Sequence, residues 1–356
     1  MPGAAARFTR GGSVVFLFTR RVAMGVARLL RTGLAVALGL GLVAVPAGAQ
    51  DAKPLRVKVF PGAQNLALYA GLAQGFFADR GLKVELLFTA SSTELRNGLA
   101  QGDFEIAHAA VDNSVAMVEL AAQDVVIVLG GDSSLNELFV QPEIRSVADL
   151  KGRSVIVDAP NTAYALQAKK ILLKHGLKEG QDYTVKPVGG TVLRAKAMQE
   201  NKEYAASILN APFSILMARQ GLKSMGRVID LLGPYQATGA FVMRGWAKSN
   251  QDTLERYIAA YIESTRWTLT PANRGEGAAL LAKWLKLPND VAERTYDLLA
   301  DPRFGLAPDA QLDQEGFRNV LALRAEIEGQ WGGKPPPPDR YVDLSYYERA
   351  AKMVGR

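Results

Sequence analysis

Polar side chains that can bind a small molecule stand directly after several apolar runs of this chain. Asp158 follows the run at 154–157, and His108 follows the run at 104–107. Asp112 and Asp132 stand close behind two further strand-like segments. Carboxylates accept hydrogen bonds, so these aspartates suit an amino group or the ring N–H of a heteroaromatic molecule. The chain has only two histidines, and one imidazole by itself makes a poor metal site.

Several of these residues have a purely structural alternative, and the sequence leaves both roles open. Ser91, Ser92 and Thr162 carry hydroxyls, which favour helix amino termini because they cap free N–H groups there. Asp158 suits the same capping role. His108 could equally be a neutral buried imidazole with a backbone partner. A contact with a ligand and a structural role are therefore both compatible with each residue.

Other residues near the same segments are also ambiguous. Gly189–Gly190 could line a ligand or only permit a turn. Phe60, Tyr164 and Tyr235 are the aromatic residues placed to stack on a planar ligand. Arg194 lies one turn into a predicted helix and could reach a carboxylate, but a solvated helix face is the simpler interpretation.

The sequence lacks the usual motifs of nucleophilic and zinc catalysis. It has no Gly-x-Ser-x-Gly elbow, no phosphate-binding loop, no His-Glu-x-x-His and no cysteine. A pair of carboxylates acting as acid and base stays open, although no spacing points to one. We therefore predict a protein that is not an enzyme and that has no catalytic residue, metal or cofactor.

The amino-terminal segment predicts export. Residues 32–50 form an uncharged apolar run behind Arg28 and Arg31, and the run ends in Ala47-Gly48-Ala49. This pattern is typical of a cleavable signal peptide over residues 1–49, with Met24 as an alternative start. Without a cysteine after it, no lipid anchor is expected. We predict a periplasmic protein.

The predicted cleavage changes the meaning of the charge. Of the formal net charge of +7, six arginines belong to residues 1–49, which leaves +1 for the mature chain. A basic protein would suggest nucleic acid as a partner, whereas a nearly neutral one does not. We therefore expect no nucleic-acid partner.

Strand-like and helix-like segments alternate along the mature chain and predict the elements that position these side chains. The run 55–60 alternates apolar and polar residues, as a strand with one buried face does. Further strand-like runs lie at 83–88, 104–107, 125–129, 154–157, 206–209 and 240–244, and the chain beyond 249 has helical patterns. Intervening helices require right-handed crossovers, so we predict two α/β units with mainly parallel sheets and a helical C-terminal region.

In such sheets, ligands bind where the parallel strands end and the helices begin. The loops at these ends therefore predict the binding residues. The candidate ligand-binding residues are Gln64, Asn65, Ser91, Ser92, His108, Asp112, Asn113, Asp132, Asp158, Asn161, Thr162, Gly190, Thr191 and Asn210.

The order of several segments resembles a known family. These segments are Ala70–Phe77 with Gly81–Glu85, then Leu99–Ala107, then Val147–Gly152. Their series is similar to that of periplasmic solute-binding proteins of the nitrate, sulfonate, taurine and thiamine-precursor class, which feed ABC importers. The resemblance covers nearly the whole mature chain.

The resemblance implies a two-lobe periplasmic-binding-protein fold with two crossover hinge strands, near 136–142 and 234–239. One lobe would comprise residues 50–138 plus 239–356, and the other residues 139–238. The lobes would close on a small molecule by hinge motion. Nitrate and sulfonate binders would need positive or neutral donors at this edge, where this chain has aspartates. The sequence therefore argues against an inorganic anion.

The function implied is capture of a small organic molecule, namely a sulfonate, a carboxylate or an amino-heteroaromatic compound. The implied partner is an ABC permease in the inner membrane, and the chain would act as a monomer. Two alternatives share the fold: an enzyme like the thiamine-pyrimidine synthase, whose cysteine-rich segment this chain lacks, and a periplasmic sensor module.

Overall fold

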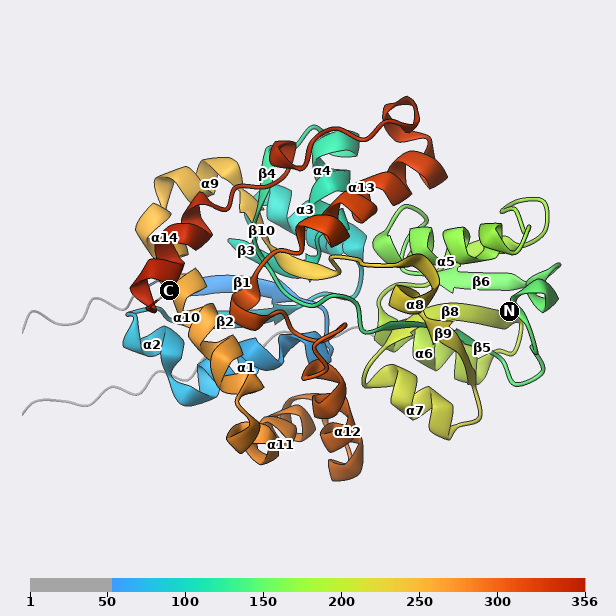
Figure 1. Cartoon of the computed structure of the whole chain (residues 1–356), viewed down its shortest axis with the longest axis horizontal. Helices are drawn as coiled ribbons and strands as arrows, with labels where there is room; N and C mark the ends of the chain where they lie inside the picture. Colours follow the sequence, from blue (N-terminus) through green and yellow to red (C-terminus); the bar gives the residue numbers. More distant parts are fainter. Residues whose placement is uncertain (1–52, 356) are drawn as a thin grey trace, which may run out of the picture. The chain divides into compact units, whose positions relative to one another are not determined.

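The computed structural model describes residues 53–355, so the predicted signal peptide lies outside the described residues. Two five-stranded sheets form its framework (Figure 1). The first has the order β2-β1-β3-β10-β4. Its strands are β1 (Leu55–Val59), β2 (Val84–Phe88), β3 (Ile106–Ala110), β4 (Val125–Gly130) and β10 (Thr238–Met243).

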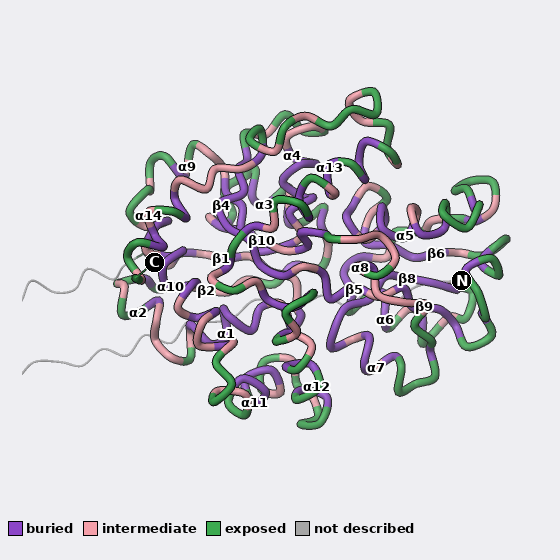
Figure 2. Tube along the Cα trace, in the orientation of Figure 1, coloured by how far each residue is buried: buried purple, intermediate pink, exposed green. Residues whose placement is uncertain are grey.

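The second sheet has the same topology with the order β7-β6-β8-β5-β9. Its strands are β5 (Asn136–Val140), β6 (Ser154–Val157), β7 (Thr184–Pro187), β8 (Tyr204–Asn210) and β9 (Lys223–Arg227). β4 and β8 are buried along most or all of their length (Figure 2), which explains their nearly uninterrupted apolar sequences.

One strand in each sheet runs against the others. β10 is antiparallel to β3 and β4, and β5 is antiparallel to β8 and β9. The chain leaves the first sheet after Gly130, joins the second at Asn136, and returns at Thr238. The segment 136–142, predicted as a crossover, therefore largely coincides with β5, a full strand of the second sheet. Both reversed strands begin at the edge where their parallel neighbours end.

Helices cover both sheets, and α10 provides the longest apolar surface. In the core of the first sheet, Tyr257, Ile258 and Tyr261 of α10 pack with Val57 and Val59 of β1. Helices next to the first sheet are α1 (Leu66–Gln74), α2 (Phe76–Asp79), α3 (Ser92–Gln101), α4 (Asp112–Ala121), α9 (Arg244–Ser249) and α10 (Gln251–Leu269). Those of the second are α5 (Ala163–Lys174), α6 (Thr191–Glu200), α7 (Phe213–Arg219) and α8 (Val228–Leu232).

The C-terminal region is helical, as predicted. It comprises α11 (Arg274–Leu285), α12 (Asn289–Leu299), α13 (Gln314–Glu328) and α14 (Ser345–Met353). α13 lies beside α5 (Figure 1), and two ion pairs, Lys169–Glu328 and Lys170–Glu326, join these helices. The segment before α14 bonds to the backbone of Ile127 in β4. Within residues 53–355, no helix combines the length and hydropathy that a membrane span requires.

Candidate ligand-binding site

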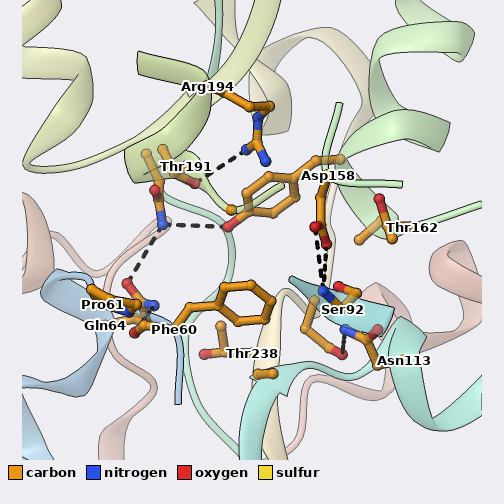
Figure 3. A pocket seen from close by; sticks show the side chains of 16 residues that line it. Phe60, Pro61, Gln64, Ser92, Asn113, Asp158, Thr162, Thr191, Arg194 and Thr238 are labelled. Carbon is orange, nitrogen blue, oxygen red and sulfur yellow. Dashed lines mark hydrogen bonds between the residues drawn. The ribbon is translucent and has the colours of Figure 1, made fainter. Parts of the chain in front are cut away.

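A small cavity lies where strands of both sheets end. Its volume is about 40 Å³. Its lining is shown in Figure 3. The lining residues are Phe60, Pro61, Gln64, Ser92, Ala109, Ala110, Asn113, Asp158, Thr162, Ala163, Tyr164, Gly190, Thr191, Arg194, Asn210 and Thr238.

Topology brings these residues together. Phe60 directly follows β1, and Asp158 directly follows β6. Thr191 begins α6 after β7, and Asn210 is the last residue of β8. Parallel strands end at one edge of a sheet, so residues distant in the sequence meet there. Eight of the fourteen predicted binding residues line the cavity: Gln64, Ser92, Asn113, Asp158, Thr162, Gly190, Thr191 and Asn210.

Asp158 connects the two sheets across the cavity. Its carboxylate is buried and accepts the backbone N–H of Ser92, with Ser92 N 3.1 and 3.3 Å from the two oxygens. Ser92 is the first residue of α3, so Asp158 lies at the positive end of that helix (Figure 3). A free N–H at a helix amino terminus would otherwise be a ready partner for an oxyanion. The protein's own carboxylate already occupies this position.

Two asparagine side chains of the lining leave oxygen atoms unused. The Nδ2 atom of Asn113 donates to the carbonyl of Ala110 at 3.2 Å, which fixes the orientation of the amide because a carbonyl only accepts. The Nδ2 atom of Asn210 lies 3.3 Å from the Tyr164 hydroxyl. Both Oδ1 atoms are buried and have no hydrogen-bond partner within the described part of the chain. A ligand that donates N–H groups would satisfy them.

Most donors of the cavity are already engaged. The Thr162 hydroxyl donates to the carbonyl of Ala159, and the Thr238 hydroxyl donates to Asp132. Gly190 donates its backbone N–H to the carbonyl of Ala90. The hydroxyls of Ser92, Tyr164 and Thr191 donate no hydrogen bond within the described chain, so the lining keeps free hydroxyl donors but no free charged donor.

Arg194 is buried, which corrects the prediction of a solvated helix face. Its guanidinium donates to four neutral oxygens, and no carboxylate of residues 53–355 lies within ion-pair distance. The acceptors are Ser207 Oγ, the Gly189 carbonyl, Thr191 Oγ1 and the Ile208 carbonyl, at 2.6–3.1 Å. Burial lowers the pKa of Arg194, while the charge of Asp158 acts in the opposite direction.

Arg194 holds the wall of the cavity rather than projecting a free charge into it. Its bonds join the loop before α6 to strand β8. It also lies over the ring of Tyr164, 5.2 Å from the ring centre. A sequence signal for its burial did exist: Thr191, Arg194, Ala195 and Met198 recur at helical spacing on the buried face of α6.

Two of the three aromatic residues predicted to stack on a ligand line the cavity. Phe60 and Tyr164 line the cavity, whereas Tyr235 is buried outside it, packed with the core that contains Phe317. Burial raises the pKa of Tyr164 and of Tyr235. Phe60 and Tyr164 come from opposite sheets, so a planar group between them would contact both.

Three predicted residues near the cavity serve the backbone instead. Asn65 donates to the Phe60 carbonyl at 2.7 Å and so shapes the loop after β1. Ser91 caps α3 by accepting the N–H of Glu94 at 3.2 Å. Asn161 uses its backbone carbonyl, which accepts Arg324 at 2.7 Å.

Asp112 is part of a buried ion pair and not of the cavity lining. Its side chain is 1% exposed, and that of Arg324 is 0% exposed. The Arg324 Nη2 atom lies 3.2 Å from Asp112 Oδ2. The pair fixes α13 to α4, and the bond from Arg324 to Asn161 extends this link to the loop before α5.

His108 and Asp132 are also buried away from the lining. The His108 ring lies 4.6 Å from the ring of Tyr261 in α10, and burial lowers its pKa to about 3. It is therefore neutral, as the structural alternative proposed, but its Nε2 has no partner within residues 53–355. Asp132 accepts the Thr238 hydroxyl and the N–H of Ser134, and burial raises its pKa.

Thr238 is the lining residue that the sequence gave least reason to expect. It is the first residue of β10, and strand beginnings are normally remote from the binding edge. Only the reversed direction of β10 brings its amino end to that edge. Among the described residues, no cluster of three or more histidine, aspartate or glutamate side chains is arranged to hold a metal.

Comparison with known proteins places the chain in a family. A family model described as NMT1/THI5 like matches residues 63–273, which is more than half of the chain. The chain belongs to the NMT1/THI5-like family. A search of curated protein sequences finds no match.

Solved structures similar to this NMT1/THI5-like chain include two proteins described as nitrate- or alkanesulfonate-binding. The periplasmic nitrate-binding protein of Synechocystis PCC 6803 has a TM-score of 0.71 and 15% identity, covering 85% of this chain and 89% of that one. The alkanesulfonate-binding protein of Xanthomonas axonopodis pv. citri, bound to MOPS, has a TM-score of 0.65 and 17% identity, covering 82% and 99%.

A third similar structure is the ligand-binding component of an ABC-type import system from Staphylococcus aureus, with zinc bound. Its TM-score is 0.70 and its identity 13%, covering 84% of this chain and 99% of that one. At such identities the likeness concerns the fold. The predicted periplasmic-binding-protein fold is confirmed.

Proposed function

We propose that this protein is the solute-binding component of an ABC importer and captures a small organic molecule that donates hydrogen bonds. The carrying observation is a set of acceptors contributed by residues of the lining: the Asp158 carboxylate, which accepts only the N–H of Ser92, and the buried, unpartnered Oδ1 atoms of Asn113 and Asn210. Among the classes predicted from the sequence, this set favours an amino-heteroaromatic ligand. Phe60 and Tyr164 would contact its ring.

An inorganic oxyanion fits the cavity less well. Asp158 already neutralises the amino end of α3, and the Arg194 guanidinium is bound to neutral oxygens of the protein. A nitrate or sulfonate would lie beside a carboxylate, and the lining would offer it hydroxyl donors but no free charged donor. This differs from what the names of the nitrate- and sulfonate-binding structures state for those proteins.

We propose two lobes, residues 50–138 plus 239–356 and residues 139–238. The division of the strands between two sheets supports two lobes, although residues 136–138 pair in the second sheet as part of β5 and Thr238 in the first as part of β10. We propose that the lobes close on the ligand and that the closed form then docks on an inner-membrane permease. Export through the signal peptide would place the mature chain, a monomer, in the periplasm.

Thermal unfolding of purified residues 50–356 with a ligand panel tests this proposal. The panel contains aminopyrimidines, aromatic carboxylates, alkanesulfonates and nitrate. A ligand at a hundred times its Kd adds about 2.7 kcal/mol of stability. We expect the aminopyrimidines to raise the Tm. A shift with sulfonate or nitrate alone would contradict the donor assignment, and no shift with any compound would contradict solute capture.

The same samples separate capture from the two alternatives. Mass spectrometry of the recovered ligand is expected to show an unchanged mass. A changed mass would indicate an enzyme of the synthase kind. Stimulation of a permease's ATPase activity by the loaded protein is expected for an importer, and its absence would favour a sensor.

A further inference from the structure

A second, wider pocket adjoins the cavity at its mouth. Its volume is about 290 Å³, compared with about 40 Å³ for the cavity. Four residues line both pockets, namely Phe60, Pro61, Gly190 and Thr191. The remaining lining of this mouth pocket consists of Phe88, Thr89, Ala90, Val192 and Leu193.

The mouth pocket is apolar in a way that the cavity is not. Seven large apolar side chains of the described chain are exposed, and three of them line this pocket: Phe88 is 44%, Val192 39% and Leu193 41% exposed. Exposed apolar side chains gathered at one place mark binding surfaces, whereas single ones are ordinary. No charged side chain is among the residues that line it.

Its polar groups are already bonded within the protein. The Thr89 hydroxyl donates to the Ser91 carbonyl at 3.0 Å, and Thr191 Oγ1 accepts Arg194. The Gly190 N–H donates to the Ala90 carbonyl at 2.8 Å. An occupant of this pocket would therefore meet mainly carbon atoms.

The two sides of the mouth come from different sheets. Phe88 ends β2 of the first sheet, whereas Val192 and Leu193 begin α6 beside the second. Gly190 allows the close approach, because a Cβ atom there would lie 3.1 Å from the Phe60 ring and 3.2 Å from the Ala90 carbonyl. The pocket thus adjoins the cavity and, like it, is lined from both sheets.

We propose that the ligand carries an apolar substituent, alkyl or aryl, which leaves the cavity and packs on Phe88, Val192 and Leu193. The hydrogen-bonding side chains line the cavity, and the pocket that adjoins it is lined mainly by carbon atoms. This inference rests on the proposed function and adds to it the substrate class: an amphipathic small molecule rather than a compact polar one.

Matched pairs of compounds test the inference by calorimetry. The short members are 4-aminopyrimidine, benzenecarboxylate and methanesulfonate. The long member of each pair carries an added butyl chain, which is placed at each free ring position of the two aromatic heads and on the carbon of methanesulfonate. Each buried methylene is expected to lower Kd about fourfold, which corresponds to about 0.8 kcal/mol. For the head that binds, we expect the best long member to bind at least tenfold more tightly than the short one.

Two variants locate the gain. In the double variant Phe88→Ser/Leu193→Ser, the ratio of the short-member Kd to the long-member Kd is expected to fall to about one. The matched control Leu173→Ser changes an apolar residue of α5 that is 38% exposed and does not line the pocket. The control is expected to keep the wild-type ratio. Far-UV circular dichroism and Tm establish that each variant is folded.

The outcomes separate this inference from the proposed function. A short head that binds without gain from the chain would overturn the inference and leave solute capture intact. A gain that persists in the folded double variant would also overturn it, because the chain would then lie elsewhere. Failure of every compound to bind would count against the proposed function and, with it, the inference.

Discussion

Replacement of Asp158 by asparagine tests the chemistry of the cavity through the sign of its effect. Asparagine has nearly the same shape, and its Oδ1 can still accept the N–H of Ser92, so the bond between the two sheets is kept. The substitution removes the negative charge and turns one acceptor into a donor. A ligand that donates hydrogen bonds loses a charged partner, whereas an oxyanion gains a donor and loses a repulsive charge.

The magnitude follows from the buried position of the carboxylate. A hydrogen bond to a charged group contributes about 1.5–3 kcal/mol, and one between neutral groups about 0.5–1.5 kcal/mol. The difference of about 1.5 kcal/mol corresponds to a Kd that is roughly tenfold larger in Asp158→Asn. Because Asp158 is only 8% exposed, solvent weakens this difference little.

Calorimetric titration with the tightest compound of the panel measures the effect. Glu200→Gln is the matched control, because it also removes one negative charge near the second sheet, but from a side chain that is 65% exposed. The control is expected to leave Kd unchanged. A tighter Kd in Asp158→Asn would refute the assignment of a donor ligand, and an unchanged Kd would remove Asp158 from the site.

Three further predictions concern the parts that hold the cavity. Arg324→Met is expected to lower the free energy of unfolding in urea by about 3–5 kcal/mol, because it leaves the Asp112 charge buried without its partner. Arg324→Met/Asp112→Asn is expected to cost less, because it removes that charge; a double variant less stable than Arg324→Met would contradict the pairing. The pKa of His108 is about 3 in the folded protein and 6.5 in the unfolded chain, so the free energy of unfolding should fall by about 2 kcal/mol from pH 7 to 5. His108→Leu should not show this pH-dependent loss of stability, and a pH profile identical to that of the wild type would contradict the burial of a neutral His108. Gly190→Ala should raise the ligand Kd severalfold, because the added Cβ would crowd Phe60. The Tm should not change, because the φ of −58° at Gly190 suits alanine; an unchanged Kd would show that the loops holding Gly190 and Phe60 separate at no cost.

The secondary structure could be read from local patterns because it depends mainly on neighbours in the chain. The alternation at 55–60 predicted β1, and the apolar runs at 125–129 and 154–157 predicted β4 and β6. β7, by contrast, has the sequence Thr-Val-Lys-Pro with mostly exposed side chains and carries little apolar signal. Its pairing with β6 defines it as a strand, and that pairing is a tertiary contact.

The candidate site was predictable where topology alone decides it. Residues at the end of a parallel strand or directly after it, such as Asn210 and Asp158, reach the binding edge. Other predicted residues lie outside the cavity lining because of where their side chains point and which partners they bind. His108 ends up against Tyr261 instead of the cavity, and Asp112 is taken up by Arg324, a residue 212 positions away.

The sequence by itself determined the family, the alternation of strands and helices, and the edge at which polar residues gather, because periodicity and strand order depend on residue types along the chain. The tertiary structure decided which polar groups remain free. Arg194 and Asp158 both line the cavity, yet only the folded structure shows that the guanidinium makes four hydrogen bonds within the protein and that the amide oxygens of Asn113 and Asn210 make none. Such partners come from segments far apart in the chain, so no local pattern encodes them.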